Sequence, residues 1–360
     1  MVKKIGLLFS IYMIFGNGPA GADGKAPADI IRVGMINCDL HAMYYAALFE
    51  GYDPLKLRDD TVGRGHAAYF YMHTFYNDPA RMTVPKAKGL ILTKVWDRNI
   101  SQAENMSRIF DGHPRVCNSF EEVSDGVDLV FIADCNGEGQ DHYELAAPGL
   151  KKRVPTFIDK PLAYDYVTAK KLVDLADKES TPLMSFSILQ ALPNVHRFKS
   201  RFAEIEAPEF GFIKGGWDTL AGQIHAITLA LTLFGDGVES VECMGETPLA
   251  CVHLGYGEAA DRPKAGVLIA CASGGTYHAT FNAGAFSSSG VLHADDFNDY
   301  TFPYGALQIL EKIKTMVKSG KPDAAYYKEM LEGVAIVSAA RRAQETGKRV
   351  FLKDIFSETR

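Results

Sequence analysis

Short apolar segments alternate with longer mixed segments through the first half of the chain. The apolar runs have the length and composition of buried parallel strands and occupy Ile30–Cys38, Gly89–Val95, Val127–Ala133, Val154–Ile158 and Pro182–Phe186. Segments with helical character follow most of them, at His41–Phe49, Ser101–Phe110, His142–Ala147 and Tyr166–Lys178. This alternation predicts a parallel sheet covered on both faces, and the right-handed crossover rule favours a Rossmann-like doubly wound domain.

The pattern changes after about residue 190. Short strand candidates now crowd together, at Phe212–Gly215, Val238–Met244, Cys251–His253, Gly266–Ala272 and Thr276–Phe281. Three longer helices are predicted among or behind them, at Ile224–Phe234, Leu307–Ser319 and Tyr326–Thr346. The predicted fold class is therefore α/β: a Rossmann-like domain at residues 29–188, then an α+β domain with a mostly antiparallel sheet at residues 189–360.

The first 24 residues have the character of a signal peptide. Lys3 and Lys4 precede the apolar run Ile5–Phe15, and a stretch of small residues follows from Gly16 to Ala22. The run is too short for a lasting membrane anchor. We therefore expect export to the periplasm or the exterior, and a cytoplasmic protein if the segment is an ordinary extension.

Composition excludes several classes of protein. Apolar residues make up 47% and charged residues 23% of the 360, which excludes a disordered chain, a fibrous repeat and a polytopic membrane protein. The formal net charge of −6 disfavours a nucleic-acid partner. The six cysteines form no C-x-x-C pair, and neither they nor the histidines have a spacing that predicts a metal site.

Several motifs occur in a recognisable order. The strand Val154–Ile158 runs into Asp159-Lys160-Pro161, Asn136 and His142 follow the strand Val127–Ala133, and His225 begins a later helix. With the tail Glu332–Leu352, these features resemble the Gfo/Idh/MocA family of oxidoreductases, relatives of glucose–fructose oxidoreductase and inositol dehydrogenase. The resemblance covers residues 30–352.

The resemblance implies a cofactor, a substrate class and a set of site residues. It implies NAD or NADP, a sugar or cyclitol substrate and self-association through an open C-terminal sheet. The implied catalytic residues are Lys160 and His225, which with Thr228 would also contact the substrate. The implied cofactor-binding residues are Asn37, Asp39, Asp97, Arg98, Asn136, Lys160 and Pro161.

The glycine fingerprint of a dinucleotide site is missing. Its three glycines should fall at positions 37, 39 and 42, which here hold Asn37, Asp39 and Ala42. A carboxylate about 4 Å from a phosphate charge costs about 4 kcal/mol at an effective dielectric near 20. Asn37 and Asp39 are therefore interpreted either as helix caps, or as parts of a remodelled turn that still admits NAD(P) or admits no dinucleotide.

Asp97 ends the second predicted strand, where an acid commonly accepts the ribose hydroxyls of NAD. The neighbouring Arg98 would instead favour the 2′-phosphate of NADP, and a turn aspartate that caps the next helix is the alternative.

His225 is the predicted general base, because imidazole titrates near neutrality. The family's aspartates four residues before and three after it are replaced by Ala221 and Thr228, so we expect a less firmly oriented ring. Asp218 is near enough in sequence to substitute.

Three functions are compatible with these residues. The first is an NAD(P)-dependent oxidoreductase that acts on a carbohydrate or cyclitol hydroxyl. The second is an exported lyase, hydratase or glycosidase-like enzyme whose cofactor cycles without net redox change, which export favours. The third is a non-enzymatic carbohydrate-binding or scaffold protein, which the missing glycines favour and the presence of Lys160 with His225 disfavours.

Overall fold

The computed structural model describes residues 30–53, 56, 85–134, 137–216, 219–245, 251–258, 261–271, 280–298 and 301–359. The predicted signal segment at residues 1–24, most of residues 51–87, Asn136 and Asp218 lie outside the described residues. The signal segment therefore stays a prediction.

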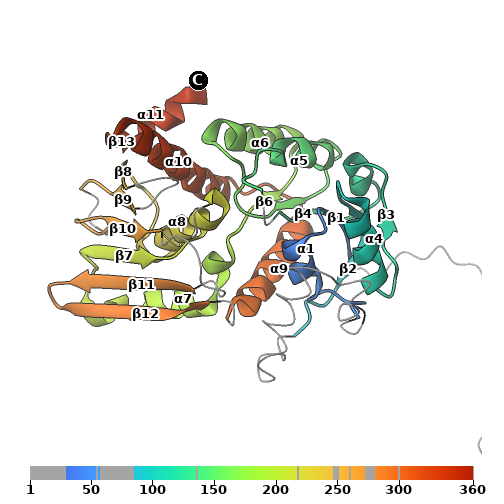
Figure 1. Ribbon diagram of the computed structural model, residues 1–360, viewed down its shortest axis with the longest axis horizontal. Coiled ribbons are helices and arrows are strands. Elements are labelled where there is room, and N and C mark those ends of the chain that lie inside the picture. The colour runs from blue at the N-terminus through green and yellow to red at the C-terminus, as the bar shows by residue number, and fades with distance from the viewer. Residues whose placement is uncertain are drawn as a thin grey trace, which may run out of the picture. The chain divides into compact units, whose positions relative to one another are not determined.

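The first sheet has six parallel strands in the order β3-β2-β1-β4-β5-β6 (Figure 1). The strands are β1 (Ile31–Ile36), β2 (Leu90–Trp96), β3 (Arg115–Val116), β4 (Leu129–Ile132), β5 (Thr156–Ile158) and β6 (Leu183–Met184). The chain leaves β1 in one direction to build β2 and β3, and then returns to build β4 to β6 on the other side. The predicted doubly wound Rossmann topology is thus confirmed.

Side chains on both faces of this sheet are buried. Met35 and Phe131 belong to one apolar cluster with the helices α1 (Leu40–Ala46) and α4 (Ile100–Ile109). Ile36 and Ile132 belong to a second cluster with α5 (His142–Lys151) and α6 (Tyr166–Glu179). Because successive side chains of a strand point to opposite faces, a strand buried on both sides is apolar throughout.

The second sheet has seven strands in the order β12-β11-β7-β10-β9-β8-β13, antiparallel except where β7 meets β10. They are β7 (Phe210–Lys214), β8 (Ser240–Met244), β9 (Cys251–Gly255), β10 (Val267–Ala270), β11 (Thr280–Ser287), β12 (Gly290–Asn298) and β13 (Val350–Phe351). Two helices, α8 (Leu220–Phe234) and α10 (Ala324–Thr346), pack against it (Figure 1). The predicted mostly antiparallel α+β half is confirmed. The predicted boundary near residue 188 stays a prediction.

Helix α10 contacts the elements of both sheets. It packs on α6 and on α8. The guanidinium of Arg341 lies 3.9 Å from the centre of the Tyr164 ring, and the backbone N–H of Leu183 donates to the hydroxyl of Tyr327 at 3.0 Å. The two halves of the chain are therefore held together by a helix with a continuous buried face.

The remaining described helices are short, apart from one. The turn of 3₁₀ helix η2 (Ile188–Ala191) leads into α7 (Pro193–Ser200), which is followed by η3 (Arg201–Ile205). Near the C-terminus, the longer α9 (Phe302–Ser319) precedes α10, and the short α11 (Leu352–Phe356) follows β13. Among the described residues, no helix has both the length and the apolarity that a membrane crossing requires.

Several elements were not predicted from the sequence, β12 and α7 among them, and some helices began earlier than expected, as α9 did. Strand β12 alternates irregularly between exposed and buried positions and includes Asp295 and Asp296, so it has no continuous apolar run. Helix α7 buries only Val195 and Phe198. Helix α9 starts at Phe302 instead of Leu307, with a proline in its first turn, a position that proline favours.

Gly34 in β1 generates a stability prediction. A Cβ atom at this position would lie 2.5 Å from the backbone oxygen of Val123 and 2.7 Å from its Cγ1. Backbone cannot yield as a flexible side chain does, so we expect Gly34→Ala to lower the free energy of unfolding by about 2 kcal/mol. Gly112→Ala is the matched control, because a Cβ at position 112 would meet nothing within 4 Å. Urea unfolding measures both, and equal stability of the two variants would contradict the packing argument.

Candidate active site

Lys160 and His225 are brought together where the first sheet meets helix α8. Lys160 follows β5 by two residues and is 5% exposed, and its Nζ donates to the backbone oxygen of Ala221 at 3.0 Å. Ala221 lies in the first turn of α8, one turn before His225. The two predicted catalytic residues, from segments far apart in the sequence, therefore occupy one site.

The imidazole of His225 is buried, with an exposed fraction of 8%. Burial, followed by the charges of Lys160 and His41, lowers its pKa well below the ordinary value. The ring is consequently neutral near pH 7 and can accept a proton.

Ser187 orients the imidazole of His225. Its Oγ lies 2.7 Å from Nδ1 of His225. The serine is itself fixed by a capping box at the start of η2, in which Gln190 Oε1 accepts the Ser187 N–H at 2.9 Å. Ser187 was not predicted as a site residue, and its only signal was the S-x-x-Q spacing of a helix start.

A second histidine joins the same site. Nδ1 of His41, in the first turn of α1, forms a hydrogen-bonded ion pair with Oδ2 of Asp159, the residue before Lys160. The side chain of Asp159 is 2% exposed and that of His41 is 24% exposed. The carboxylate therefore fixes one ring nitrogen of a histidine whose other edge is accessible. No role was predicted for His41 from the sequence.

Thr228 lies one turn after His225 and lines a cavity of about 30 Å³ beside Lys160. Its hydroxyl lies 2.8 Å from the backbone oxygen of Ile224 and 3.2 Å from that of His225, so its hydrogen is used within the helix. The cavity has room for little more than a water molecule. Pro161, joined to Lys160 by a cis peptide bond, is buried against the same cavity.

A larger cleft of about 520 Å³ opens at the carboxyl ends of β1, β2 and β4, the switch point of the first sheet. It is lined by Asn37, Asp39, Asp97, Arg98, Asn99, Gln102, Asp134, Gly137, Gln140 and Asp141. Asn37 has φ +66°, the left-handed conformation that a glycine would adopt in this turn. One position of the turn thus has the backbone conformation that glycine favours, although the fingerprint glycines are absent.

Two carboxylates accept hydrogen bonds from backbone N–H groups in and beside that turn. The N–H of Cys38 donates to Oδ2 of Asp97 at 2.7 Å, and Oδ1 of Asp97 accepts from Asn99 N at 2.7 Å. Asp39 caps α1 and accepts from His41 N at 3.2 Å, which confirms the interpretation of Asp39 as a helix cap. The volume of the cleft would admit a dinucleotide, and Asp97 follows β2 at the position where an acid commonly accepts ribose hydroxyls, whereas the negative charge of the cleft opposes a diphosphate.

The described lining of the cleft is strongly acidic. Among the described residues that line it, four carboxylates face one arginine, Arg98, whose Nη2 lies 3.1 Å from Oδ2 of Asp141. Asp141, Asp134 and His142 also bring one ligand atom each within 4.8 Å of one another. The ring nitrogens of His142 already face Asp134 Oδ2 and Leu162 O, both at 3.2 Å, so this cluster does not indicate a metal site.

Asp134 generates a prediction on pH. Burial opposes its ionisation, but hydrogen bonds from His142 and Gly137 N and the charge of Lys160 outweigh burial and lower its pKa to about 2. A lowered pKa stabilises the fold above the ordinary value of 3.8, and this stabilisation is lost as the pH falls towards 2. Asp134→Asn should therefore be less stable than wild type by about 2 kcal/mol at neutral pH, with the difference vanishing near pH 2.

Denaturant unfolding of both proteins across this pH range measures the difference. Asp295→Asn, on the exposed side of β12, is the control and should follow the wild-type curve. A stability difference between Asp134→Asn and wild type that does not change with pH would contradict the assignment.

Residues 61–186 match the family model GFO_IDH_MocA, described as an oxidoreductase family with an NAD-binding Rossmann fold. The match begins after β1 and the turn that lacks its glycines. No curated protein matches the sequence.

Solved structures share the fold over most of the chain. A myo-inositol dehydrogenase from Corynebacterium glutamicum is 14% identical, with a TM-score of 0.66 over 90% of this chain and 99% of the other. A myo-inositol 2-dehydrogenase from Lactobacillus plantarum is 11% identical, with a TM-score of 0.68 over 89% and 99%. An oxidoreductase from Agrobacterium radiobacter, solved with NAD⁺, L-tartaric acid and magnesium, is 16% identical, with a TM-score of 0.62 over 90% and 99%.

Proposed function

Since residues 61–186 match the Gfo/Idh/MocA family model and inositol dehydrogenases share the fold, we propose that the chain is a member of this family of oxidoreductases and that it oxidises or reduces a carbohydrate or cyclitol at a hydroxyl-bearing carbon, with NAD as the hydride carrier. The observation that carries this proposal is the pairing of a buried ammonium, Lys160, with a buried neutral imidazole, His225, at the start of α8. The carbohydrate substrate is suggested by the inositol dehydrogenases among the similar structures.

Each of the two residues has a distinct role. Lys160 uses one N–H on Ala221 O, and its remaining N–H groups can donate to the oxygen of the substrate hydroxyl. His225 accepts the proton of that hydroxyl, because its lowered pKa keeps it unprotonated. Bound NAD⁺ supplies the acceptor for the hydride that leaves the same carbon. In the reverse direction the imidazolium returns the proton to the carbonyl oxygen.

Two further side chains, Ser187 and Asp159, orient the histidines of this site. Ser187 fixes the rotation of the His225 ring through Nδ1, which directs the other ring nitrogen away from η2. Asp159 fixes His41, whose charge when protonated lowers the proton affinity of His225. We assign both Ser187 and His41 as positioning residues.

We propose that NAD is held in the cleft by Asn37, Asp39, Asp97 and Arg98, and that Lys160 and Pro161 contact it from the segment that follows β5. Asp97 can accept the 2′- and 3′-hydroxyls of the adenosine ribose, and its charge disfavours the 2′-phosphate of NADP. Arg98 is paired with Asp141 and is less available for that phosphate. NAD is therefore the preferred cofactor.

Replacement of either catalytic residue should abolish turnover. Lys160→Met and His225→Asn are expected to lower kcat by at least about a hundredfold, the scale of one general acid–base group. Lys171→Met on α6 and His293→Asn on β12 are matched controls on exposed positions and should keep wild-type activity. Steady-state oxidation of a panel of sugars and inositols gives the readout, with thermal melting to verify the fold. Full activity in both site variants would disprove the assignment.

Removal of the Asp39 charge should tighten cofactor binding. Asn retains the helix cap but not the negative charge, so Asp39→Asn is expected to bind NAD about tenfold more tightly than wild type. Calorimetric titration with NAD and NADP measures both affinities, and Asp295→Asn controls for a general change in net charge. Unchanged or weaker NAD binding would show that the diphosphate does not approach position 39.

One experiment separates this function from the lyase and binding-protein alternatives. Nicotinamide nucleotide released by denaturing the purified protein, or bound on titration, supports an enzyme, and a sugar-dependent change in nicotinamide absorbance then distinguishes net redox from internal cycling. We further propose that the chain is exported through residues 1–24 and that it self-associates through the second sheet. Amino-terminal sequencing of the secreted protein and light scattering test these two points.

A further inference from the structure

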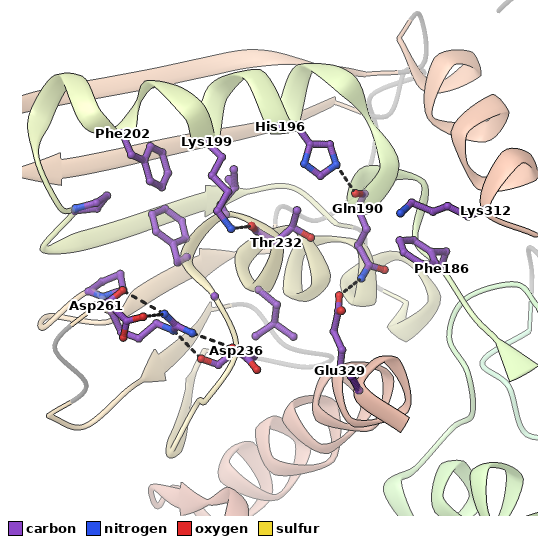
Figure 2. Close-up of a pocket in the computed structure, with 18 residues that line it drawn as sticks. Phe186, Gln190, His196, Lys199, Phe202, Thr232, Asp236, Asp261, Lys312 and Glu329 are labelled. Atoms are coloured by element: carbon purple, nitrogen blue, oxygen red, sulfur yellow. Dashed lines mark hydrogen bonds and ion pairs between the residues drawn. The ribbon is translucent and has the colours of Figure 1, made fainter. Parts of the chain in front are cut away.

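A second cavity lies in the α+β half, away from the cleft of the first sheet. It measures about 630 Å³ and is bounded by α7, the end of α8, η2, α9, the start of α10 and the segment before β10 (Figure 2). Its volume is within the range of about 300–1,000 Å³ that is usual for small-ligand sites. Elements distant in the sequence build it together, so it is a property of the fold.

The floor of the cavity is apolar and its polar rim is fixed. Leu231, Phe234 and Phe186 are buried beneath it, and Phe202 stacks on Phe234 with ring centres 5.5 Å apart. On one side, Nζ of Lys199 donates to the backbone oxygen of Thr232 at 2.7 Å. The rim is thus held in position before any ligand binds.

The opposite side of the rim is held by further contacts, which Figure 2 shows as dashed lines. Nε2 of Gln190 lies 3.2 Å from Oε1 of Glu329, and Arg262 bonds to Asp236 at 2.8 Å and to Asp261 at 2.6 Å. A ligand would therefore meet preorganised planar groups.

Charges on the lining cancel. In the part of the chain that the structure describes, three cations and three carboxyl groups line the cavity: Lys199, Arg262 and Lys312 against Asp236, Asp261 and Glu329. An ionic ligand would lose its hydration and face repulsion as well as attraction. A neutral ligand with many hydroxyls would not, since each hydroxyl both donates and accepts.

Groups on both sides of the rim can form further hydrogen bonds with such hydroxyls. The ammonium of Lys199 has three N–H groups, of which Thr232 uses one, and partial burial lowers its pKa. The carboxyl of Glu329 accepts one hydrogen bond, from Gln190. The C–H face of a sugar ring matches the apolar floor, as in other sites where one side of a ligand is apolar and its edge is polar.

From this lining we propose that the cavity is a binding site for a neutral saccharide, separate from the site at Lys160. Gln190, Leu231 and Glu329 also line the small cavity beside Lys160, so one wall is shared between the two. Neither Lys160 nor His225 is among the described residues that line the large cavity, so a saccharide bound there lies outside the reaction centre. The proposal does not depend on oxidoreductase activity.

The test is direct binding without cofactor. Calorimetry or saturation-transfer NMR on the full chain would use neutral probes (glucose, galactose, N-acetylglucosamine, maltose and cellobiose) and two charged ones (glucuronate and glucosamine). We expect at least one neutral probe to bind wild type and Lys160→Met with equal affinity, and to bind more tightly than both charged probes. Lys199→Met and Glu329→Gln should each weaken it about tenfold, the loss of one hydrogen bond to a charged group.

Matched controls on the neighbouring surface are Lys328→Met on α10 and Glu311→Gln on α9, which should bind as wild type. Three results would overturn the proposal: no neutral probe binds, a charged probe binds more tightly, or binding is lost in Lys160→Met and kept in both cavity variants. The last would assign the saccharide to the reaction centre. Because turnover is not measured, failure of the proposed oxidoreductase activity leaves this test unaffected.

Discussion

The site depends on the burial of one ammonium group. A lysine with almost no exposure must be supplied with acceptors, because the interior does not solvate its charge. Lys160 finds one in the first turn of α8, at Ala221 O, and Asp134 lies close enough for their charges to interact. This need fixes the end of β5 against the start of α8, and it is why His225, one turn further along, faces the same space.

Much of the fold was predictable from the sequence because local pattern determines it. A parallel strand buried on both faces must be apolar throughout, so β1, β2 and β4 were found to within a few residues. Strand β12 was not, since an edge strand with exposed aspartates has no such run. The left-handed backbone conformation of Asn37 could not be predicted either. A glycine at this position would have indicated that conformation, whereas asparagine adopts it only in a minority of cases.

The contacts between the site residues were less predictable than the identity of those residues. Lys160 and His225 carry recognisable motifs, and the structure brings them together. Ser187 and His225 are separated by 38 residues, and His41 and Asp159 by 118, and no periodicity reports such contacts. The first of these hydrogen bonds forms only after the two sheets have assembled, and the second joins two segments that follow different strands of the first sheet. Likewise, the N–H of Cys38 in the first turn donates to Asp97, which follows a different strand.

Helix α10 has a consequence for the evolution and engineering of this chain. Its buried face is shared. Tyr327 and Val334 belong to the apolar cluster on one face of the first sheet, and Ile336 and Ala340 belong to the cluster that also contains the core of the second sheet. A fragment that ended between the two sheets would expose one half of that face to water and leave a large apolar patch on its surface. The two halves are consequently not interchangeable modules: recombination with a relative must transfer the C-terminal helix together with the surface of the first sheet on which it rests.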